Sequence, residues 1–379
     1  MNLALRIRKI LPYSIYKLLE MIQLYKTYYL ATLIGGLKFR KFFGKDNKKL
    51  YPTMLIIGST TRCNLNCTIC DRHSFKVEDL KLYNLKKIES LIRGAEDINL
   101  TGYGEPLLNA EIDSIIEYIY SVNNRKNIIS LVTNGTRLTE KFGALLSGRI
   151  NNITISLNAA TEETYRRDMK NAKLQDVLEN ITEFLSVLDD DSKNRIILSF
   201  VAHADNFKEI PDFIDLAFGL GVKKVRVGQF AIFREEDIRL SLLNVRGEYN
   251  RYIDLALKRA NKSNIILYAN KFDSPFNHNI SKHVCFFPFK QLIINPDGSI
   301  DGPCCCGRFD FGNVFQEDFD NIWFGQNYMK MRKKRYLPTC ITCRDFASFD
   351  SLEAHFCHEF LIPNRKKLSS LLKDGKGMG

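Results

Sequence analysis

The sequence predicts an α/β fold in which helices connect the strands of a parallel sheet. Six short apolar runs alternate with amphipathic stretches of about 10–20 residues between Pro52 and Asn270. The runs are apolar almost throughout, as in strands that are buried on both faces. Right-handed crossovers through the intervening helices make such strands parallel. The sheet is either open and doubly wound or curved into a barrel, and in both cases ligands bind at the carboxyl ends of the strands.

Each expected element follows from its own pattern. The expected strands are 54–59, 97–102, 128–135, 152–158, 196–203 and 223–230. Helices are expected at 109–122, 161–188 and 206–221, where apolar residues recur at helical spacing. The last helix has Asn206 as its expected cap and ends at Gly219 and Gly221.

The composition and pattern of the sequence change after about residue 280. An NPDG turn at 295–298 separates two strand-like runs, and a short helix is expected around Trp323. This region has few apolar residues to build a core alone and is dense in cysteine. We therefore expect a small subdomain that is held by metal or clusters.

Length and composition are those of a globular protein. The chain has 379 residues, of which 45% are hydrophobic and 26% are charged, enough for one large α/β domain and a smaller one. No stretch resembles a secretory signal, so the ten cysteines indicate a reducing, cytoplasmic location. Clustered cysteines in that compartment bind metal or carry redox chemistry more often than they form disulfides.

Most of the net charge of +12 lies in residues 1–50, which hold eleven Lys and Arg against Glu20 and Asp46. The longest uncharged stretch there, Thr27 to Leu37, has eleven residues, whereas a transmembrane helix needs about 20. Basic residues mixed with Tyr, Leu and Ile suit a helix lying on an anionic membrane surface, here the inner face of the membrane. Helices packed on the main domain with exposed lysines are the alternative. We expect no nucleic-acid partner, because no basic stretch carries a docking motif.

Three cysteines, Cys63, Cys67 and Cys70, follow the first strand in the stretch "TTRCNLNCTICDRHS". At this spacing on a loop, all three sulfurs can face one centre. A zinc ion would need a fourth ligand, for which His73 is available. A [4Fe–4S] cluster bound by three thiolates would instead leave one iron open for a substrate or cofactor. Spacing alone leaves both interpretations open.

The CxxxCxxC motif after the first strand, followed by strand–helix repeats, resembles the radical S-adenosylmethionine (radical SAM) superfamily. The resemblance implies a [4Fe–4S] cluster on the three cysteines, with SAM chelating the fourth iron and His73 an ordinary loop residue. It also implies a partial (β/α)6 TIM-like barrel. Reductive cleavage of SAM, with flavodoxin or ferredoxin as the electron donor, gives a 5′-deoxyadenosyl radical in this family.

Further strand ends carry residues that this family uses for SAM. "LTGYGEPLL" matches the second-strand motif GGEP at Gly104, Glu105 and Pro106, with Tyr103 in place of the first glycine. Glycine allows close backbone approach, and a carboxylate forms a charge-assisted hydrogen bond with an ammonium group. Ile69 stands where many members have an aromatic residue, a departure that affects adenine packing but no cluster ligand.

The fourth strand supplies the remaining expected contacts. Ser156 matches the family's fourth-strand serine, and Arg166 is preferred to Arg167 and Lys170 as its basic partner at the SAM carboxylate. The full set of SAM-binding residues implied by the resemblance is Ile69, Tyr103, Gly104, Glu105, Thr133, Asn134, Ser156, Asn158, Arg166 and Val227. Candidates for proton transfer, by strand-end position alone, are Tyr103, His203, Arg226 and Gln229.

The C-terminal cysteines resemble the SPASM/twitch extension of this superfamily. One auxiliary [4Fe–4S] cluster is implied, with Cys285, Cys304 (or its neighbours Cys305 and Cys306), Cys340 and Cys343 as ligands; Cys357 has no assigned role. A zinc ribbon on the same thiolates is the alternative. The expected domains are a basic N-terminal segment at 1–50, the radical SAM core at 51–275, the auxiliary-cluster domain at 276–360 and a polar tail at 361–379.

The implied function is that of a radical SAM oxidoreductase, which takes a hydrogen atom from an unactivated C–H bond. Residues 1–50 are too short for the leader-binding domain that peptide-modifying members often carry. We therefore expect a small sugar-like, aminocyclitol or lipid-linked substrate that is dehydrogenated or epimerised. A ribosomal-peptide maturase is the alternative within the superfamily, and a zinc-dependent nucleic-acid-binding protein is the alternative from another class.

Overall fold

The computed structural model describes residues 51–70, 72, 76–122, 127–232, 235–272, 287–302 and 311–334. Several expectations concern residues outside these ranges: the basic segment 1–50, His73, the polar tail, and all cysteines from Cys285 onward. None of the described helices is long and apolar enough to span a membrane.

All six predicted strands are present, and they are the core of the sheet. They are β1 (Met54–Ile57), β3 (Asp97–Leu100), β4 (Ile128–Thr133), β5 (Asn152–Ser156), β7 (Ile196–Ala202) and β8 (Lys224–Gln229). Shorter strands are β2 (Asn66–Cys67), β6 (Met169–Lys170), β9 (Ile266–Tyr268), β10 (Gln291–Ile294) and β11 (Ile300–Gly302). Burial alternates along β1, β3 and β5, with every second residue buried and the others only half-buried. The two faces of the sheet are therefore not equally covered, unlike the expected burial on both faces.

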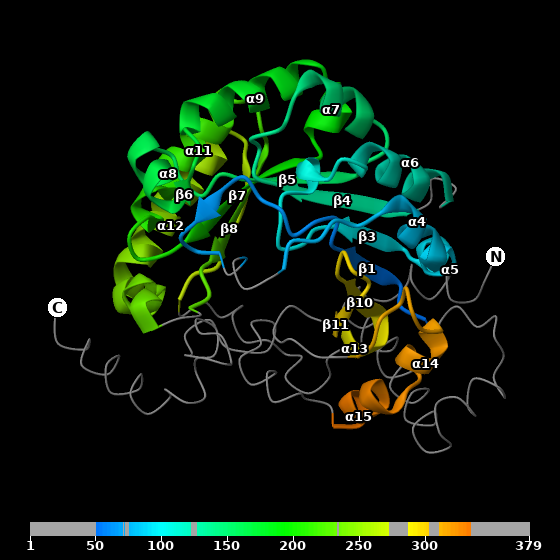
Figure 1. The fold of residues 1–379 in the computed structure, drawn as a ribbon. Helices are drawn as coiled ribbons and strands as arrows, with labels where there is room; N and C mark the ends of the chain where they lie inside the picture. Colours follow the sequence, from blue (N-terminus) through cyan, green and yellow to red (C-terminus); the bar gives the residue numbers. More distant parts are fainter. Residues whose placement is uncertain are drawn as a thin grey trace, which may run out of the picture.

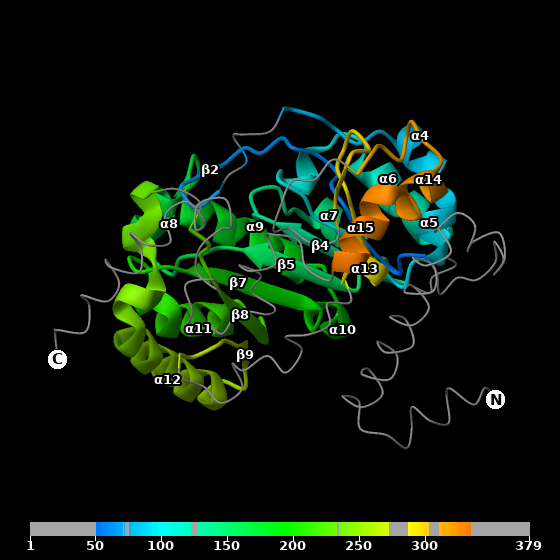
Figure 2. The same ribbon diagram turned by 90° about the horizontal axis from the view of Figure 1, so that it is seen from below.

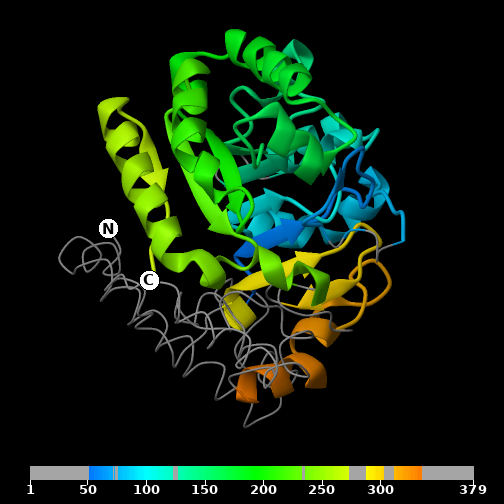
Figure 3. The ribbon, with the colours of Figure 1, turned by 90° about the vertical axis from the view of Figure 1, so that its left-hand side faces the viewer.

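The strand order decides between an open sheet and a barrel. In the described residues the main sheet runs β11-β10-β1-β3-β4-β5-β7-β8-β9, and its neighbours are parallel except for β10 and β11. A doubly wound sheet reverses its direction at a switch point, whereas here the chain order is kept from β1 to β9. Right-handed crossovers that all advance in one direction place their helices on the same face. Figures 1 and 3 show these helices along the outside of a curved sheet, so the predicted partial barrel is confirmed.

The helices fill the connections between strands. They are α4 (Leu82–Leu85), α5 (Glu89–Gly94), α6 (Ile112–Val122), α7 (Glu140–Leu146), α8 (Glu162–Asp168), α9 (Leu174–Ser186), α10 (Asp190–Lys193), α11 (Ile210–Gly219), α12 (Arg246–Lys262), α13 (Phe287–Lys290), α14 (Phe319–Trp323) and α15 (Gln326–Lys334). Short 3-10 helices are η3 (Lys86–Ile88), η4 (Pro106–Leu108), η5 (Phe207–Glu209), η6 (Glu235–Leu240) and η7 (Leu242–Val245). The predicted helix at 109–122 is confirmed as α6, whose buried isoleucines pack on the sheet.

The helix expected at 161–188 is instead two helices, α8 and α9, separated by the short strand β6. The chain leaves the helical path at Met169, and Asn171 adopts a positive φ of 78°, which asparagine tolerates better than most residues. β6 pairs with β2, so the break in the helix serves a contact distant in sequence.

Asn206 also differs from its expected role as a helix cap. It makes no side-chain cap hydrogen bond to η5, the short helix that precedes α11. Its side-chain amide accepts a hydrogen bond from the His203 N–H and donates to the carbonyls of Asn158 and Val201. Asn206 therefore links the ends of β5 and β7, and the helix starts without it.

The region after residue 286 extends the main sheet. β10 and β11 form the predicted hairpin, and α14 is the predicted helix at Trp323. β10 lies parallel to β1, and the buried side chains of Leu292, Ile294 and Trp323 belong to the same hydrophobic core as Leu55. Figure 2 shows α14 and α15 on the side of the molecule that carries α4 and α5. The described part of this region therefore has no separate core and is held by the sheet itself.

Candidate active site at the cysteine loop

The cysteine loop, residues 60–70, begins three residues after β1 and is closed at its base. Thr60 forms an antiparallel bridge with Asp79, and its hydroxyl donates a hydrogen bond of 2.6 Å to the Asp79 carboxylate. The Thr61 hydroxyl donates to the Lys76 carbonyl at 2.7 Å. The Arg62 guanidinium forms an ion pair of 2.9 Å with the same Asp79. The first residues of the loop are thus fixed to the segment 76–79, which follows the loop.

The loop base packs directly on the segment that follows β3. A side chain at Gly104 would place its Cβ 2.3 Å from the Arg62 carbonyl oxygen and 2.5 Å from that of Thr60. The next residue, Glu105, donates its backbone N–H to the Arg62 carbonyl at 2.7 Å. The glycine of the GEP motif is therefore required for close approach of two backbones, and the approaching partner in the described structure is the cysteine loop.

Glu105 links the end of β3 to the end of β4. Its carboxylate, 2% exposed, accepts hydrogen bonds from the Thr133 hydroxyl and the Asn134 N–H, both at 2.7 Å. A third, from the Leu107 N–H, is 3.2 Å long. Burial raises the pKa of Glu105 to about 7, although these three hydrogen bonds act to lower it. The predicted residues Glu105, Thr133 and Asn134 therefore lie together, with the carboxylate turned toward β4.

Asn134 connects this network to the first cysteine. Its side-chain NH2 lies 3.7 Å from the Cys63 sulfur, as a weak hydrogen-bond donor, and 3.1 Å from the Asn64 side-chain oxygen. The Asn134 side-chain oxygen accepts from the Thr136 hydroxyl at 2.6 Å, and that hydroxyl accepts from the Asn64 amide at 2.8 Å. Three polar side chains thus close a ring that holds the middle of the cysteine loop against the end of β4.

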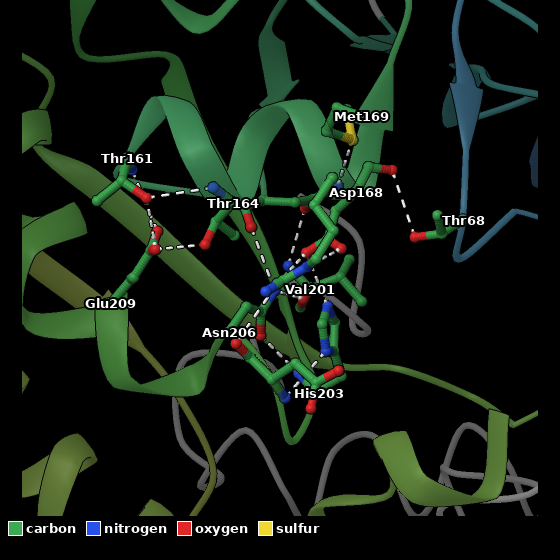
Figure 4. A network of polar contacts seen from close by, with 12 residues as sticks. Thr68, Thr161, Thr164, Asp168, Met169, Val201, His203, Asn206 and Glu209 are labelled. Atoms are coloured by element: carbon green, nitrogen blue, oxygen red, sulfur yellow. Dashed lines mark hydrogen bonds and ion pairs between the residues drawn. The ribbon is translucent and has the colours of Figure 1, made fainter.

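A third anchor holds the loop near Cys67. The two-residue strands β2 and β6 pair antiparallel, with Cys67 opposite Met169. The Thr68 N–H continues this pairing and donates to the Asp168 carbonyl at 2.9 Å. Figure 4 shows the Thr68 side chain contacting the Asp168 carbonyl at the end of α8. The Cys70 N–H then turns back to the Cys67 carbonyl at 3.2 Å.

The end of α8 is fixed in turn by a buried polar pair. The His203 imidazole Nε2 lies 3.0 Å from the Asp168 carboxylate, and both side chains are almost fully buried. His203 Nδ1 accepts from the Asp205 N–H, so Nε2 carries the proton and donates. Arg167 adds two hydrogen bonds of 2.8 Å to the same carboxylate. Burial raises the pKa of Asp168, but the hydrogen bonds from Arg167 and His203 outweigh it and lower it to about 2. Asp168 is therefore ionised at neutral pH.

The three thiols share an environment that suits a positively charged cluster. All three are half-buried. Burial raises the pKa of Cys63, and burial together with the neighbouring Cys70 and Cys63 raises the pKa of Cys67 to about 12. The Arg72 guanidinium opposes this rise at both residues. Bound iron would supply the charge that such thiolates need, so the residues fit an iron–sulfur cluster.

Within the described ranges, no group of three or more His, Cys, Asp or Glu side chains is arranged so as to hold a metal ion. We therefore expect the cysteine side chains to turn on their fixed loop when a cluster binds. Their role as ligands is a prediction from the motif, and the loop geometry is what the structure adds to it.

Other expected SAM contacts lie along the same strand ends. Ser156 ends β5 and is half-buried, and Ile69 packs on a small apolar cluster of Phe230, Ile232 and Leu240 beyond β8. Val227 belongs to the main core. Asn158 has a positive φ of 59°; its amide accepts from the Val201 N–H at 2.9 Å and lies 3.4 Å from the Met169 sulfur. Asn158 is thus already engaged in fixing β5 to β6 and β7.

The three basic candidates for binding the SAM carboxylate, on α8 and β6, have different surroundings. The side chain of Arg166 is 69% exposed, and its guanidinium lies 4.0 Å from Glu162 on the same helix. Arg167 is engaged with Asp168, and Lys170 lies exposed on β6. Arg166 therefore sits on the surface of α8, and its contact with a SAM carboxylate stays a prediction.

The four candidates for proton transfer are also spread out. His203 is buried in its pair with Asp168, whereas Arg226 is exposed. Tyr103 and Gln229 are half-buried at the ends of β3 and β8.

Several residues of this site were not indicated by the sequence. Asn64, Thr136 and Asp168 position the loop, yet each looks like an ordinary polar residue in its own segment. Asn64 had a weak signal, since it stands between two cysteines of the motif. Asp168 had none, because its contacts with His203 and Thr68 join segments that are distant in sequence.

Comparison with known proteins agrees with this geometry. Residues 57–217 match the family model of the radical SAM superfamily, and residues 285–344 match that of the SPASM iron–sulfur cluster-binding domain. The chain belongs to the radical SAM superfamily. Its radical SAM and SPASM domains imply [4Fe–4S] clusters and SAM as cofactors. These matches favour iron–sulfur clusters over zinc at its cysteines.

Curated relatives of this radical SAM protein match mainly its core. A probable GTP 3′,8-cyclase of Methanocaldococcus jannaschii is 27% identical over 199 residues, 51% of this chain and 62% of that protein. A probable GTP 3′,8-cyclase of Methanothermobacter thermautotrophicus is 35% identical over 159 residues, 40% of this chain and 51% of that protein. The chain spans about half to three-fifths of the length of these relatives.

Solved radical SAM structures share the fold over a larger part of the chain. Streptococcus suis SuiB bound to S-adenosylmethionine superposes with a TM-score of 0.60 at 16% identity, over 82% of this chain and 75% of SuiB. Native anSMEcpe with bound AdoMet gives a TM-score of 0.59 at 15% identity, over 85% of this chain and 100% of that chain. At this level of identity the likeness concerns the fold.

Proposed function

We propose that this radical SAM enzyme removes a hydrogen atom from a carbon of a sugar-like substrate, leading to dehydrogenation or epimerisation. When bound, the cluster and SAM supply a 5′-deoxyadenosyl radical that can take hydrogen from an unactivated C–H bond. The observation that carries the proposal is the cysteine loop, which is fixed to the ends of β3 and β4 and, through β6, to α8. A cluster on this loop lies at the carboxyl edge of the sheet, where ligands of parallel barrels bind.

The residues of the chain have separate tasks in this proposal. Cys63, Cys67 and Cys70 bind the cluster on a loop whose backbone is already held by hydrogen bonds in the metal-free protein. Gly104 lets the β3 end approach that loop, and Glu105 orients the polar groups of Thr133 and Asn134 at the β4 end. Such preorganisation reduces the ordering that cofactor binding requires.

The face of the sheet away from the helices supports a polar substrate. Burial alternates along the strands, and the half-buried set includes Asn99 on β3, Ser130 on β4 and Thr154 on β5. The two relatives named above are GTP 3′,8-cyclases, and the 3′ position in that name is a ribose carbon. Both points favour a substrate rich in hydroxyl groups over an apolar one.

The remaining parts of the proposal concern residues outside the described ranges. Cys285, Cys304, Cys340 and Cys343 would bind one auxiliary [4Fe–4S] cluster, which accepts an electron or positions the substrate. Flavodoxin or ferredoxin would deliver the electron for SAM cleavage in the cytoplasm. Residues 1–50 would hold the enzyme near a membrane surface if the substrate is lipid-linked.

The decisive experiment measures metal content and SAM cleavage together. Anaerobically reconstituted protein should be brown, contain about eight irons if both four-iron clusters assemble, and form 5′-deoxyadenosine from SAM and a chemical reductant. Replacing Cys63, Cys67 and Cys70 with alanine should remove about four irons and abolish 5′-deoxyadenosine, while the auxiliary cluster stays. Cys357→Ala is the matched control and should keep both. Colourless protein that binds zinc, or cleavage that survives the triple substitution, would contradict the proposal.

A further inference from the structure

Tyr165 is a buried tyrosine with an unusual hydroxyl group. It lies on α8, its side chain is fully buried, and its hydroxyl has no hydrogen-bond partner among the described residues. Buried hydroxyl groups nearly always have a partner, because desolvation without one is unfavourable. An unpartnered hydroxyl at this position therefore requires an explanation.

The position of Tyr165 brings it to the cysteine loop. The Met169 N–H donates to the Tyr165 carbonyl, so Tyr165 lies one helical turn before β6. Met169 is in turn the direct β-partner of Cys67. Both Tyr165 and Cys67 contribute to the same hydrophobic core. Tyr165 thus lies close in the chain to the pairing that holds Cys67, with the only polar atom of its side chain inside the protein.

The electrostatics point to the same neighbour. Burial raises the pKa of Tyr165, and the next contribution in size is the charge of Cys67, followed by that of Glu162. A neutral thiol is a weak acceptor, whereas a metal-bound thiolate is a good one.

We propose that the Tyr165 hydroxyl donates a hydrogen bond to the Cys67 sulfur when the iron–sulfur cluster is bound, and thereby raises the reduction potential of that cluster. The inference rests on the proposed role of Cys67 as a ligand. Hydrogen bonds to cluster sulfurs withdraw negative charge, and the reduced cluster, which is one electron more negative, gains more from them. The orphaned hydroxyl is thus a donor that acquires its acceptor on cofactor binding.

The test is Tyr165→Phe in the holoenzyme, which removes one oxygen and keeps the ring. An EPR-monitored titration with dithionite should show a midpoint potential that is more negative for the cluster whose signal changes when SAM is added. A loss of roughly tenfold in the reduction equilibrium constant corresponds to about 59 mV for a one-electron couple. The auxiliary-cluster signal of the same sample is an internal control and should not move.

The apo protein provides a second readout. Because Tyr165→Phe removes a buried hydroxyl that has no partner there, the thermal midpoint of the apo variant should equal or exceed that of the wild type. The matched control is Tyr249→Phe: this buried hydroxyl donates to the Asn270 carbonyl at 3.1 Å, so its loss should lower the midpoint and leave both potentials unchanged.

The outcomes separate this inference from the proposed function. If the cluster assembles in the variant and its potential equals that of the wild type, the hydrogen bond does not exist and the inference is wrong. If no cluster assembles on Cys63, Cys67 and Cys70 in the wild type, the proposed function itself fails. A lower apo midpoint for Tyr165→Phe would mean that the hydroxyl has a structural partner, which also overturns the inference.

Discussion

Gly104 shows how a single residue sets the position of the cysteine loop. The carbonyl oxygens of Thr60 and Arg62 occupy the space that a side chain would need, and both belong to the backbone. Backbone atoms cannot rotate away as a flexible side chain can. The hydrogen bond from the Glu105 N–H to Arg62 fixes the same contact from the other side. Any side chain at this position must therefore displace the base of the loop.

We expect Gly104→Ala to lower the free energy of unfolding of the apo protein by about 1–3 kcal/mol, the usual effect of overpacking. The displaced loop should also bind less iron at Cys63, Cys67 and Cys70. Chemical denaturation and iron analysis measure the two effects. Gly94→Ala is the control, because no atom lies within 4 Å of its added Cβ. Equal stability and iron content in the two variants would contradict this account.

Among the secondary-structure elements, the pairing of β2 with β6 fixes the position of the cysteine loop near Cys67. Two residues on each side make a very short ladder, which could not persist alone in water. It is held because the end of α8 is fixed by Asp168, which binds both Arg167 and His203. The loop near Cys67 thus depends on a buried carboxylate, Asp168, that it does not itself contain.

Asp168→Asn should weaken this element. The amide keeps one acceptor oxygen, whereas the carboxylate accepts from both Arg167 and His203, so one buried donor loses its partner. We expect a loss of about 1–3 kcal/mol in the free energy of unfolding, together with faster hydrogen exchange at the Thr68 N–H. Denaturant titration and exchange mass spectrometry would measure these changes.

Asp205→Asn is the control for that experiment. Its ion pair with Arg239 is largely exposed, and exposed pairs contribute less than about 1 kcal/mol. If both variants unfold alike and Thr68 exchanges at the wild-type rate, the α8 end does not hold the loop.

For the whole molecule, the main consequence of the fold is that core and C-terminal region share one interior. Trp323 on α14 is fully buried and stacks near Phe319 and Tyr328. It belongs to the same continuous core as Leu55 on β1. The described part of the cluster-binding region should therefore unfold together with the barrel.

Trp323→Ala should lower the free energy of unfolding by about 3–5 kcal/mol, as large-to-small changes in a core do. Because the core is shared, the apo variant should still unfold in one transition, and the unfolding midpoint of the barrel should be lowered as well. Phe218→Ala is the control, since that side chain is 61% exposed. Two separate transitions, with the barrel at its wild-type midpoint, would show that the regions are independent.

Local patterns in the sequence were sufficient for most of the fold and for part of the site. Continuous apolar runs indicated the six strands, and the polar residues after them indicated which groups meet at the carboxyl edge. Glu105, Thr133 and Asn134 do lie together there. These inferences succeed because strand direction and side-chain period are properties of a few neighbouring residues.

The features that were missed depend on contacts between distant segments. The pattern at 161–188 has helical spacing throughout, and the break at Met169 is explained by its partner Cys67, some 100 residues earlier. The pairing of Asp168 with His203 and that of β10 with β1 are likewise tertiary. No local signal distinguishes a polar residue that finds such a partner from one that faces water.

The parallel pairing of β1 with β10 also has a consequence for how the molecule forms. β1 is made first among the core strands, yet one of its two neighbours is about 240 residues further along the chain. Contacts of such long range close large loops and form slowly. During synthesis, the strand that leads into the cysteines therefore has one edge unpaired until β10 has left the ribosome.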